Sequence, residues 1–251
     1  MAPPFISVIV VCKNPGAHLV DALDSVWAQQ EVAFELVVVD GASNDGTADW
    51  LAARRDRIAT LISEPDGGVY EAMNKGLAVA RGEWVLFLGA DDRLVGQGVL
   101  CEASKWLART SSGVAAGEVA YDDGRIYKLA RRINPLARNF VRHPAAFYRR
   151  TLFAEHDSFD SSLTFAGDYD FNLRLWKAHV RFKPFPLRIA ACRPGGLSDA
   201  GHRRAYREEI AVRHRYYPAW RCWFWDALTL LRALRPSHAH QRSSLRGASA
   251  D

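Results

Sequence analysis

The chain has 251 residues, 49% of them hydrophobic and 24% charged, which is typical of a folded protein long enough for one large α/β domain. Its four cysteines are scattered and have no C-x-x-C spacing, which argues against a zinc site or a disulfide framework and favours a reducing compartment. We find no signal peptide and no apolar run of about 18 residues, so we expect a cytoplasmic protein without a spanning helix.

The net charge of +5 is concentrated near the C-terminus. Between Arg203 and Arg246 there are ten arginines and only three acidic residues. A basic segment of this kind can contact anionic lipid, nucleic acid or phosphorylated substrates. Because no nucleic-acid-binding module surrounds it, we do not expect nucleic acid as a partner.

The first part of the chain alternates between apolar, β-branched runs and amphipathic helical patterns. This alternation predicts a mostly parallel central sheet flanked by helices and joined by right-handed crossovers. The predicted strands are Phe5 to Cys12, Phe34 to Val39, Ala59 to Ser63 and Trp84 to Leu88, and the predicted helices are about His18 to Gln30, Ala48 to Arg55 and Val69 to Ala80.

Acidic residues follow three of these strands. Asp40, Asp66 and the pair Asp91-Asp92 all fall at carboxyl ends of strands, the edge where open α/β sheets bind ligands. Adjacent carboxylates suit Mg2+ or Mn2+, which usually carry substrate phosphates. Taken singly, Asp40 could open an Asx turn and Asp91-Asp92 could form a solvated turn with a helix cap. Their convergence favours a nucleotide and metal site, although neither G-x-x-x-x-G-K-[ST] nor G-x-G-x-x-G is present.

The second half has a different organisation. Residues 112–127 contain two short strand-like runs around Asp122-Asp123-Gly124, a hairpin signal, and residues 131–142 form a basic, irregular stretch that could cover the site. A strand is expected over residues 145–148, a helix from Asp168 to Ala178, and an edge strand over residues 181–191, which contain two prolines.

Several of these motifs together resemble the family 2 glycosyltransferases. They are V-V-V-D-G-A-S-N-D-G-T, S-E-P-D-G-G-V-Y-E-A-M-N-K-G and A-R-G-E-W-V-L-F-L-G-A-D-D, followed later by H-P-A-A-F-Y-R-R-T-L-F, F-A-G-D-Y-D-F-N-L-R-L-W and R-P-G-G-L-S. The resemblance spans roughly Ile6 to Ser198. It implies a GT-A fold and an inverting enzyme that uses nucleotide-diphosphate sugars, similar to members that build bacterial surface polysaccharides.

The resemblance also implies roles for individual residues. Asp40 would bind the base, usually uracil, while Asp66 and Asn74 would contribute to the nucleotide pocket. Asp91 would lie by the ribose and the metal, and Asp92 would be the direct metal ligand. The sequence departs from the family pattern in two places: Gly89 stands where members often have Asp or Asn, and Gly67 where many have Lys.

Asp168 falls where the family keeps its catalytic base. Inverting transfer needs a carboxylate, separate from the metal acids, that takes the proton of the acceptor hydroxyl. Locally, Asp168 could instead cap the helix, and Asp170 is expected to form a salt bridge or an acceptor contact. His143 is either a structural hydrogen-bonding residue or an acceptor or phosphate contact.

The C-terminal part completes the prediction. The glycine loop at residues 193–198 could fold over a diphosphate, and His202 could be a late metal or phosphate contact. We expect a GT-A domain over residues 1–202, a basic, aromatic helical extension over 203–236 and a disordered tail from 237 to 251. The extension either packs on the domain or lies on the inner face of the membrane, near a polyprenyl-linked acceptor.

The predicted function is therefore transfer of a sugar, with a UDP-sugar favoured, to a hydroxyl of a glycan or lipid-linked glycan. A non-catalytic scaffold that binds nucleotide sugars is the alternative. A nucleotidyltransferase is disfavoured, because it would need phosphate-binding basic residues early in the chain, and we identify none there.

Overall fold

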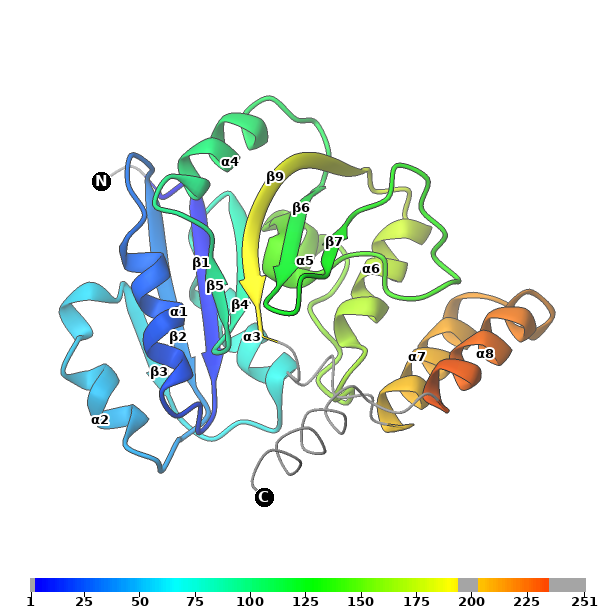
Figure 1. Ribbon diagram of the computed structural model, residues 1–251, viewed down its shortest axis with the longest axis horizontal. Helices are drawn as coiled ribbons and strands as arrows, with labels where there is room; N and C mark the ends of the chain where they lie inside the picture. The colour runs from blue at the N-terminus through cyan, green and yellow to red at the C-terminus, as the bar shows by residue number, and fades with distance from the viewer. Residues whose placement is uncertain (1–2, 194–202, 235–251) are drawn as a thin grey trace, which may run out of the picture.

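The computed structural model describes residues 3–193 and 203–234, which form one α/β fold (Figure 1). The nine strands are β1 (Ile6–Cys12), β2 (Phe34–Asp40), β3 (Thr60–Ser63), β4 (Trp84–Gly89), β5 (Asp92–Leu94), β6 (Val114–Tyr121), β7 (Ile126–Lys128), β8 (Ala146–Arg149) and β9 (Phe182–Cys192). The helices are α1 (His18–Trp27), α2 (Thr47–Ala52), α3 (Val69–Val79), α4 (Val99–Leu107), α5 (Thr151–Glu155), α6 (Gly167–Lys177), α7 (Arg203–Tyr216) and α8 (Ala219–Ala233).

The strands form one sheet with the order β3-β2-β1-β4-β8-β6-β9-β5, and β7 pairs with β6. The first four strands in this order run parallel to one another, as their alternation with helices predicted. β8 then pairs antiparallel with both β4 and β6, and β9 runs parallel to β6. The predicted hairpin around Asp122 is confirmed as β6 and β7.

Helices cover both faces of the sheet and enclose a core on each side (Figure 1). Because successive side chains of a strand point to opposite faces, Ile9 and Val11 of β1 join one core and Val8 and Val10 join the other. Residues of α3, α5 and α6 pack on the Ile9 side, and residues of α1, α2 and α4 pack on the Val8 side. A sheet buried on both faces explains why these strands are apolar without alternation.

The register of the parallel strands aligns their carboxyl ends. Cys12 of β1 is paired with Asp40 of β2, Asp40 with Ser63 of β3, and Val11 with Gly89 of β4. The loops that carry the predicted acidic residues therefore leave the sheet along one edge.

The prediction that residues 181–191 form an edge strand is wrong for the strand as a whole, because β9 lies between β6 and β5. In the described residues its pairing with β5 covers only Ala190 to Cys192, whereas the part with Pro184 and Pro186 pairs with β6 alone. A residue without an N–H group is tolerated there, because one side of the strand makes no ladder hydrogen bonds.

The C-terminal extension forms a hairpin of two helices, α7 and α8, which projects from the side of the molecule next to α6 (Figure 1). Residues 194–202 and 235–251, which include the predicted glycine loop, His202 and the tail, lie outside the described residues. No helix in the part of the chain that the structure describes is long and apolar enough to cross a membrane.

Candidate active site

A cavity of about 940 Å³ opens at the carboxyl edge of the parallel strands. It is lined by the ends of β1 and β4, the start of α3, the irregular stretch before β8, the start of α6 and residues of the α7–α8 hairpin. Asp66, Asp91, Asp92, His143 and Asp168 all line it, so the fold brings together most of the predicted site residues.

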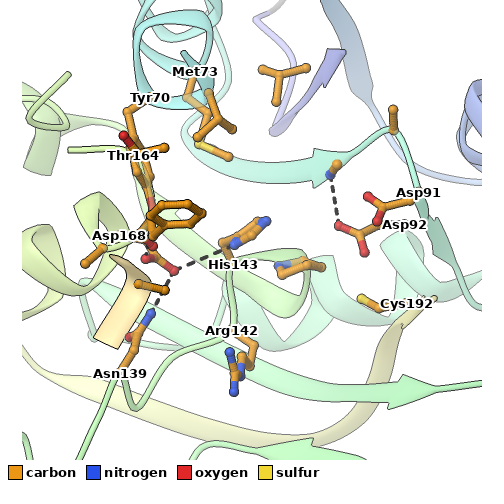
Figure 2. Close-up of a pocket in the computed structure, with 18 of the residues that line it drawn as sticks. Tyr70, Met73, Asp91, Asp92, Asn139, Arg142, His143, Thr164, Asp168 and Cys192 are labelled. Atoms are coloured by element: carbon orange, nitrogen blue, oxygen red, sulfur yellow. Dashed lines mark hydrogen bonds and ion pairs between the residues drawn. The ribbon is translucent and has the colours of Figure 1, made fainter. Parts of the chain in front are cut away.

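Asp91 and Asp92 occupy the turn from β4 into β5, at one end of the cavity (Figure 2). The Asp92 carboxylate accepts the backbone N–H of Gly89 at 2.9 Å. A Cβ at Gly89 would lie 2.8 Å from Asp91 Oδ1 and 3.0 Å from Asp92 Oδ2, so a side chain there would require the two carboxylates to shift. With glycine at this position, which departs from the family pattern, both carboxylates lie close to the end of β4.

The environment of this pair favours a cation. Burial raises the pKa of Asp92, and the negative charge of Asp91 adds to this, while His143 and the Cys192 thiol act in the opposite direction. Neither carboxylate has a salt bridge to another described residue. No group of three or more His, Cys, Asp or Glu side chains that could hold a metal ion occurs in the described residues. Among the described residues, Asp91 and Asp92 could hold Mg2+ or Mn2+, and the substrate and water could supply further oxygen ligands.

Asp66 lies across the strand ends from this pair, in the loop between β3 and α3. Its carboxylate accepts the N–H of Gly68 at 3.1 Å and lies 3.9 Å from the Lys13 ammonium group. The Asp66 side chain is almost fully buried, whereas Lys13 is more than half exposed. The ion pair places a positive charge next to the predicted nucleotide pocket.

Two predicted donor-binding residues, Asp40 and Asn74, do not line this cavity. Asp40 is fully buried and accepts hydrogen bonds from Ser63 Oγ at 2.7 Å and from the Ser43 N–H at 3.2 Å. It therefore performs the loop-opening role that the sequence left open, and its contact with a base stays a prediction. Asn74 makes two hydrogen bonds to the backbone of Phe159, so it braces the segment before α6.

Asp168 lies in the first turn of α6, on the opposite side of the cavity from Asp91 and Asp92 (Figure 2). Asn139 donates a hydrogen bond to Asp168 Oδ2 at 2.7 Å, and Tyr70 Oη donates to Asp168 Oδ1 at 3.2 Å. The backbone N–H of Tyr169 also donates to Oδ1, at 2.9 Å. The carboxylate is thus oriented by three donors, two of them side chains from distant parts of the chain.

Tyr70 reaches Asp168 because α6 begins with a glycine. A Cβ at Gly167 would lie 2.7 Å from the Tyr70 ring, so a side chain at this position would displace the ring. Burial raises the pKa of Tyr70, and the neighbouring Asp168 charge raises it further. Tyr70 therefore keeps its proton and acts as a donor, which it shares between Asp168 and the carbonyl oxygen of Phe165.

His143 lies between the two sets of carboxylates (Figure 2). Its Nδ1 is 3.7 Å from Asp168 Oδ2. Burial disfavours the charged imidazolium, but the negative charges of Asp168 and Asp92 outweigh it, so the pKa of His143 is raised. His143 therefore contacts a site carboxylate and lines the cavity, while its contact with acceptor or phosphate stays a prediction.

Asp170 has the structural role that was expected for it. Its buried carboxylate forms salt bridges with Arg174, at 2.7 Å, and with Arg215 of α7, at 3.0 Å. It therefore ties α6 to the C-terminal hairpin and leaves Asp168 as the carboxylate of α6 that lines the cavity.

Several residues that line the cavity were not predicted from the sequence. Lys13 directly follows β1, so the strand-end rule that located Asp40 could have found it, and this early basic residue removes the reason given against a nucleotidyltransferase. Asn139 and Arg142 lie in the irregular stretch before β8, where the sequence has no periodic pattern. Tyr70 matches the apolar face of α3 and carried no separate signal.

Solved structures identify the class of fold. S. aureus TarS 1-349 in complex with UDP-GlcNAc has a TM-score of 0.71 and 21% identity, with 90% of this chain and 72% of that chain covered. The mannosyltransferase PcManGT from Pyrobaculum calidifontis, in complex with GDP-Man and Mn2+, has a TM-score of 0.67 and 21% identity, with 100% and 77% covered. The fold is thus that of the GT-A glycosyltransferases.

Sequence comparison gives the family. The sequence profile described as glycosyl transferase family 2 matches residues 7–212. The PGL/p-HBAD biosynthesis glycosyltransferase of Mycobacterium tuberculosis is 36% identical over 183 residues, which cover 69% of this chain and 70% of that protein. An uncharacterized glycosyltransferase of the same species is 29% identical over 230 residues, 86% of each chain. The chain belongs to glycosyl transferase family 2 and is therefore an enzyme, a glycosyltransferase, rather than a nucleotidyltransferase.

Proposed function

We propose that this enzyme transfers a sugar from a nucleotide-diphosphate sugar, preferably a UDP-sugar, to a hydroxyl group of a glycan or lipid-linked glycan, with inversion at the anomeric carbon. The observation that carries the proposal is the separation of two carboxylate sites within one cavity. Asp91 and Asp92 lie at one end, and Asp168 lies at the other. Inverting transfer needs this division, because the leaving group and the attacking hydroxyl lie on opposite faces of the sugar.

Asp168 acts as the general base. It takes the proton of the acceptor hydroxyl as the hydroxyl oxygen forms a bond to the anomeric carbon. The bond between that carbon and the diphosphate oxygen breaks, and the nucleoside diphosphate leaves with the electron pair. Asn139 and Tyr70 hold the carboxylate in place for this step through their hydrogen bonds.

The nucleotide half of the donor lies against the strand ends, with Asp66 and Lys13 at the pocket and the buried Asp40 at the end of β2. A divalent cation, Mg2+ or Mn2+, held by Asp92 and Asp91 would neutralise the charge that develops on the leaving diphosphate. The raised pKa of Asp92 and the absence of a salt bridge to either carboxylate among the described residues support this role. His143 keeps a positive charge between the two carboxylate sites when it is protonated.

The choice of donor and acceptor draws on the comparisons. TarS was solved with UDP and with UDP-GlcNAc, and PcManGT with GDP-Man and Mn2+, so a uridine or guanosine diphosphate sugar is the class to test. Relatives from Mycobacterium are named PGL/p-HBAD biosynthesis glycosyltransferases, which supports a role in glycan biosynthesis.

A thermal-shift screen tests the donor assignment. UDP-, GDP- and dTDP-sugars are each added with and without Mn2+, and the melting temperature is recorded. A ligand present at 100 times its Kd stabilises the native state by about 2.7 kcal/mol. We expect a stabilisation that needs both one nucleotide and the ion; its absence with every donor would contradict the donor site.

A further inference from the structure

Helix α8 turns the small side chains of Cys222 and Thr229 inward and most of its large apolar side chains outward. Thr229 is fully buried, and its hydroxyl accepts a hydrogen bond from the Arg213 guanidinium of α7 at 3.2 Å. Asp226 also faces α7, where it forms an ion pair with Arg213. A helix on the surface of a water-soluble protein normally has the opposite arrangement, with its apolar stripe against the core.

The outward side of α8 is a continuous apolar stripe. Its large side chains are Trp220 (74% exposed), Trp223 (68%), Phe224 (47%), Leu230 (52%), Leu231 (59%) and Leu234 (73%). Counted from Trp220, the other five follow at three, four, ten, eleven and fourteen residues, which places all six on one face of the helix. A contiguous exposed face of this size and composition marks an interaction surface.

The stripe is presented by a firmly anchored hairpin. Arg213 is fully buried and bridges Glu209 of its own helix to Asp226 of α8, which fixes the two helices to each other. Glu208 accepts the backbone N–H groups of residues 164–166, so α7 is also fixed to the segment before α6. The outward orientation of the stripe therefore follows from a specific buried network.

The charges of the hairpin select the kind of partner. The three acidic side chains of the described hairpin, Glu208, Glu209 and Asp226, are all engaged in the contacts given above. The exposed arginines Arg203, Arg204, Arg207 and Arg221 have no acidic partner among the described residues. The solvent-facing charge of the hairpin is thus positive, which complements an anionic surface.

We propose that α8 docks this enzyme on an anionic phospholipid bilayer. The helix lies parallel to the membrane plane, with its aromatic and leucine side chains among the acyl chains and headgroups and with Arg221 at the phosphates. Tryptophan is the residue that most favours this interfacial depth. At 15 residues, α8 is shorter than the roughly 20 residues that a helix needs to span a bilayer. The docking does not depend on which sugar is transferred.

Docking would also bring the cavity close to the bilayer. Arg232 of α8 lines the same cavity as Asp168, and its guanidinium donates a hydrogen bond to the carbonyl oxygen of Ala137 at 3.2 Å. The helix that rests on the membrane is therefore also part of the cavity wall. If the proposed function is right, an acceptor attached to a lipid could therefore enter the site without leaving the bilayer.

Vesicle flotation of the full chain tests the docking. We expect the protein to float with vesicles of phosphatidylcholine that contain phosphatidylglycerol, much less with phosphatidylcholine alone, and less as salt is added. Leu230→Ser should weaken the partitioning about tenfold, because a leucine loses its burial in the membrane. Ile126→Ser on β7 is the matched control, since Ile126 is 51% exposed against 52% for Leu230, and it should float as the wild type does.

Three results would overturn the proposal. The first is that the wild-type protein floats with neither kind of vesicle, and the second is that Leu230→Ser and Ile126→Ser lose flotation equally. The third is that light scattering shows a wild-type dimer that Leu230→Ser dissociates, while neither the wild type nor the variant floats. The last result would identify a second copy of the chain as the occupant of the stripe. Circular dichroism melting of each variant shows that it is folded. The donor thermal shift is measured in parallel without lipid, so failure of donor binding and failure of docking are separate outcomes.

Discussion

The two ends of the cavity are built in different ways. Asp91 and Asp92 follow a strand of the parallel sheet, and the register of the backbone places them beside the other strand ends. Asp168 instead depends on side chains from α3 and from the irregular stretch before β8, which are separated from it by 98 and 29 residues in the sequence. One end is therefore positioned by the register of the strands, whereas the other depends on side-chain contacts between distant segments.

Removal of the base should have the largest effect on activity. Asp168→Asn preserves the size of the side chain but cannot take the proton of the acceptor hydroxyl. We expect kcat to fall by about 10²- to 10⁴-fold, the usual contribution of general base catalysis, while the affinity for the donor stays nearly unchanged. Steady-state transfer assays together with donor titration separate the two quantities.

Asp160→Asn is the matched control for this change. Asp160 lies just before α6 and pairs with Arg215, but it does not line the cavity. Its variant should keep the wild-type kcat. An Asp168→Asn enzyme with normal activity would show that the base lies elsewhere.

Asp92→Asn tests the opposite end. The amide keeps the shape and can still accept the N–H of Gly89, but it lacks the charge that would hold a cation. We expect the apparent affinity for Mn2+ in the presence of donor to fall about 10- to 100-fold, with a smaller change in donor affinity when the ion is absent. Mn2+ titrations that follow the melting temperature measure this, and an unchanged ion dependence would rule out Asp92 as a metal ligand.

A third change separates stability from function within the parallel half. Glu35 of β2 is buried at the edge of the sheet opposite the site, where it accepts hydrogen bonds from Ser7 Oγ at 2.6 Å and from Arg81 Nε at 2.9 Å. Burial would raise its pKa, but these hydrogen bonds and the Arg81 charge outweigh burial and lower the pKa of Glu35. We expect Glu35→Gln to lower the free energy of unfolding at neutral pH by about 2 kcal/mol without changing kcat.

The sign of the pH dependence follows from the lowered pKa. The stabilisation is fully present above the pKa of an unfolded glutamate, about 4.3, and is lost as the pH falls through the lower folded pKa. The difference in unfolding free energy between wild type and Glu35→Gln should therefore shrink as the pH is lowered below about 4.3. Urea denaturation over this range measures it, and a difference that does not change with pH would contradict the assignment.

The same contrast explains what the sequence could predict. Apolar, β-branched runs located the parallel strands, and the acidic residues at their ends followed from the rule that such ends meet at one edge. Lys13 obeys this rule too, because it directly follows β1. Asn139 and Tyr70 could not be found in this way, because their roles arise from contacts between segments far apart in the chain. The pairing of β9 with β5 is also a long-range contact that its prolines concealed.

Tyr70→Phe gives the smallest effect and addresses the side-chain support of Asp168 most directly. The change removes one hydroxyl that donates to the Asp168 carboxylate at 3.2 Å and leaves the ring packed against Phe159. The Asp168 carboxylate then keeps only two of its three donors and is held less firmly for the transfer step. About 1 kcal/mol lost corresponds to about a fivefold fall in kcat, with the affinity for the donor unchanged. Steady-state assays with donor titration measure both quantities. An unchanged kcat would mean that Tyr70 acts only through packing, whereas the predicted fall would show that a residue of α3 positions the base on α6.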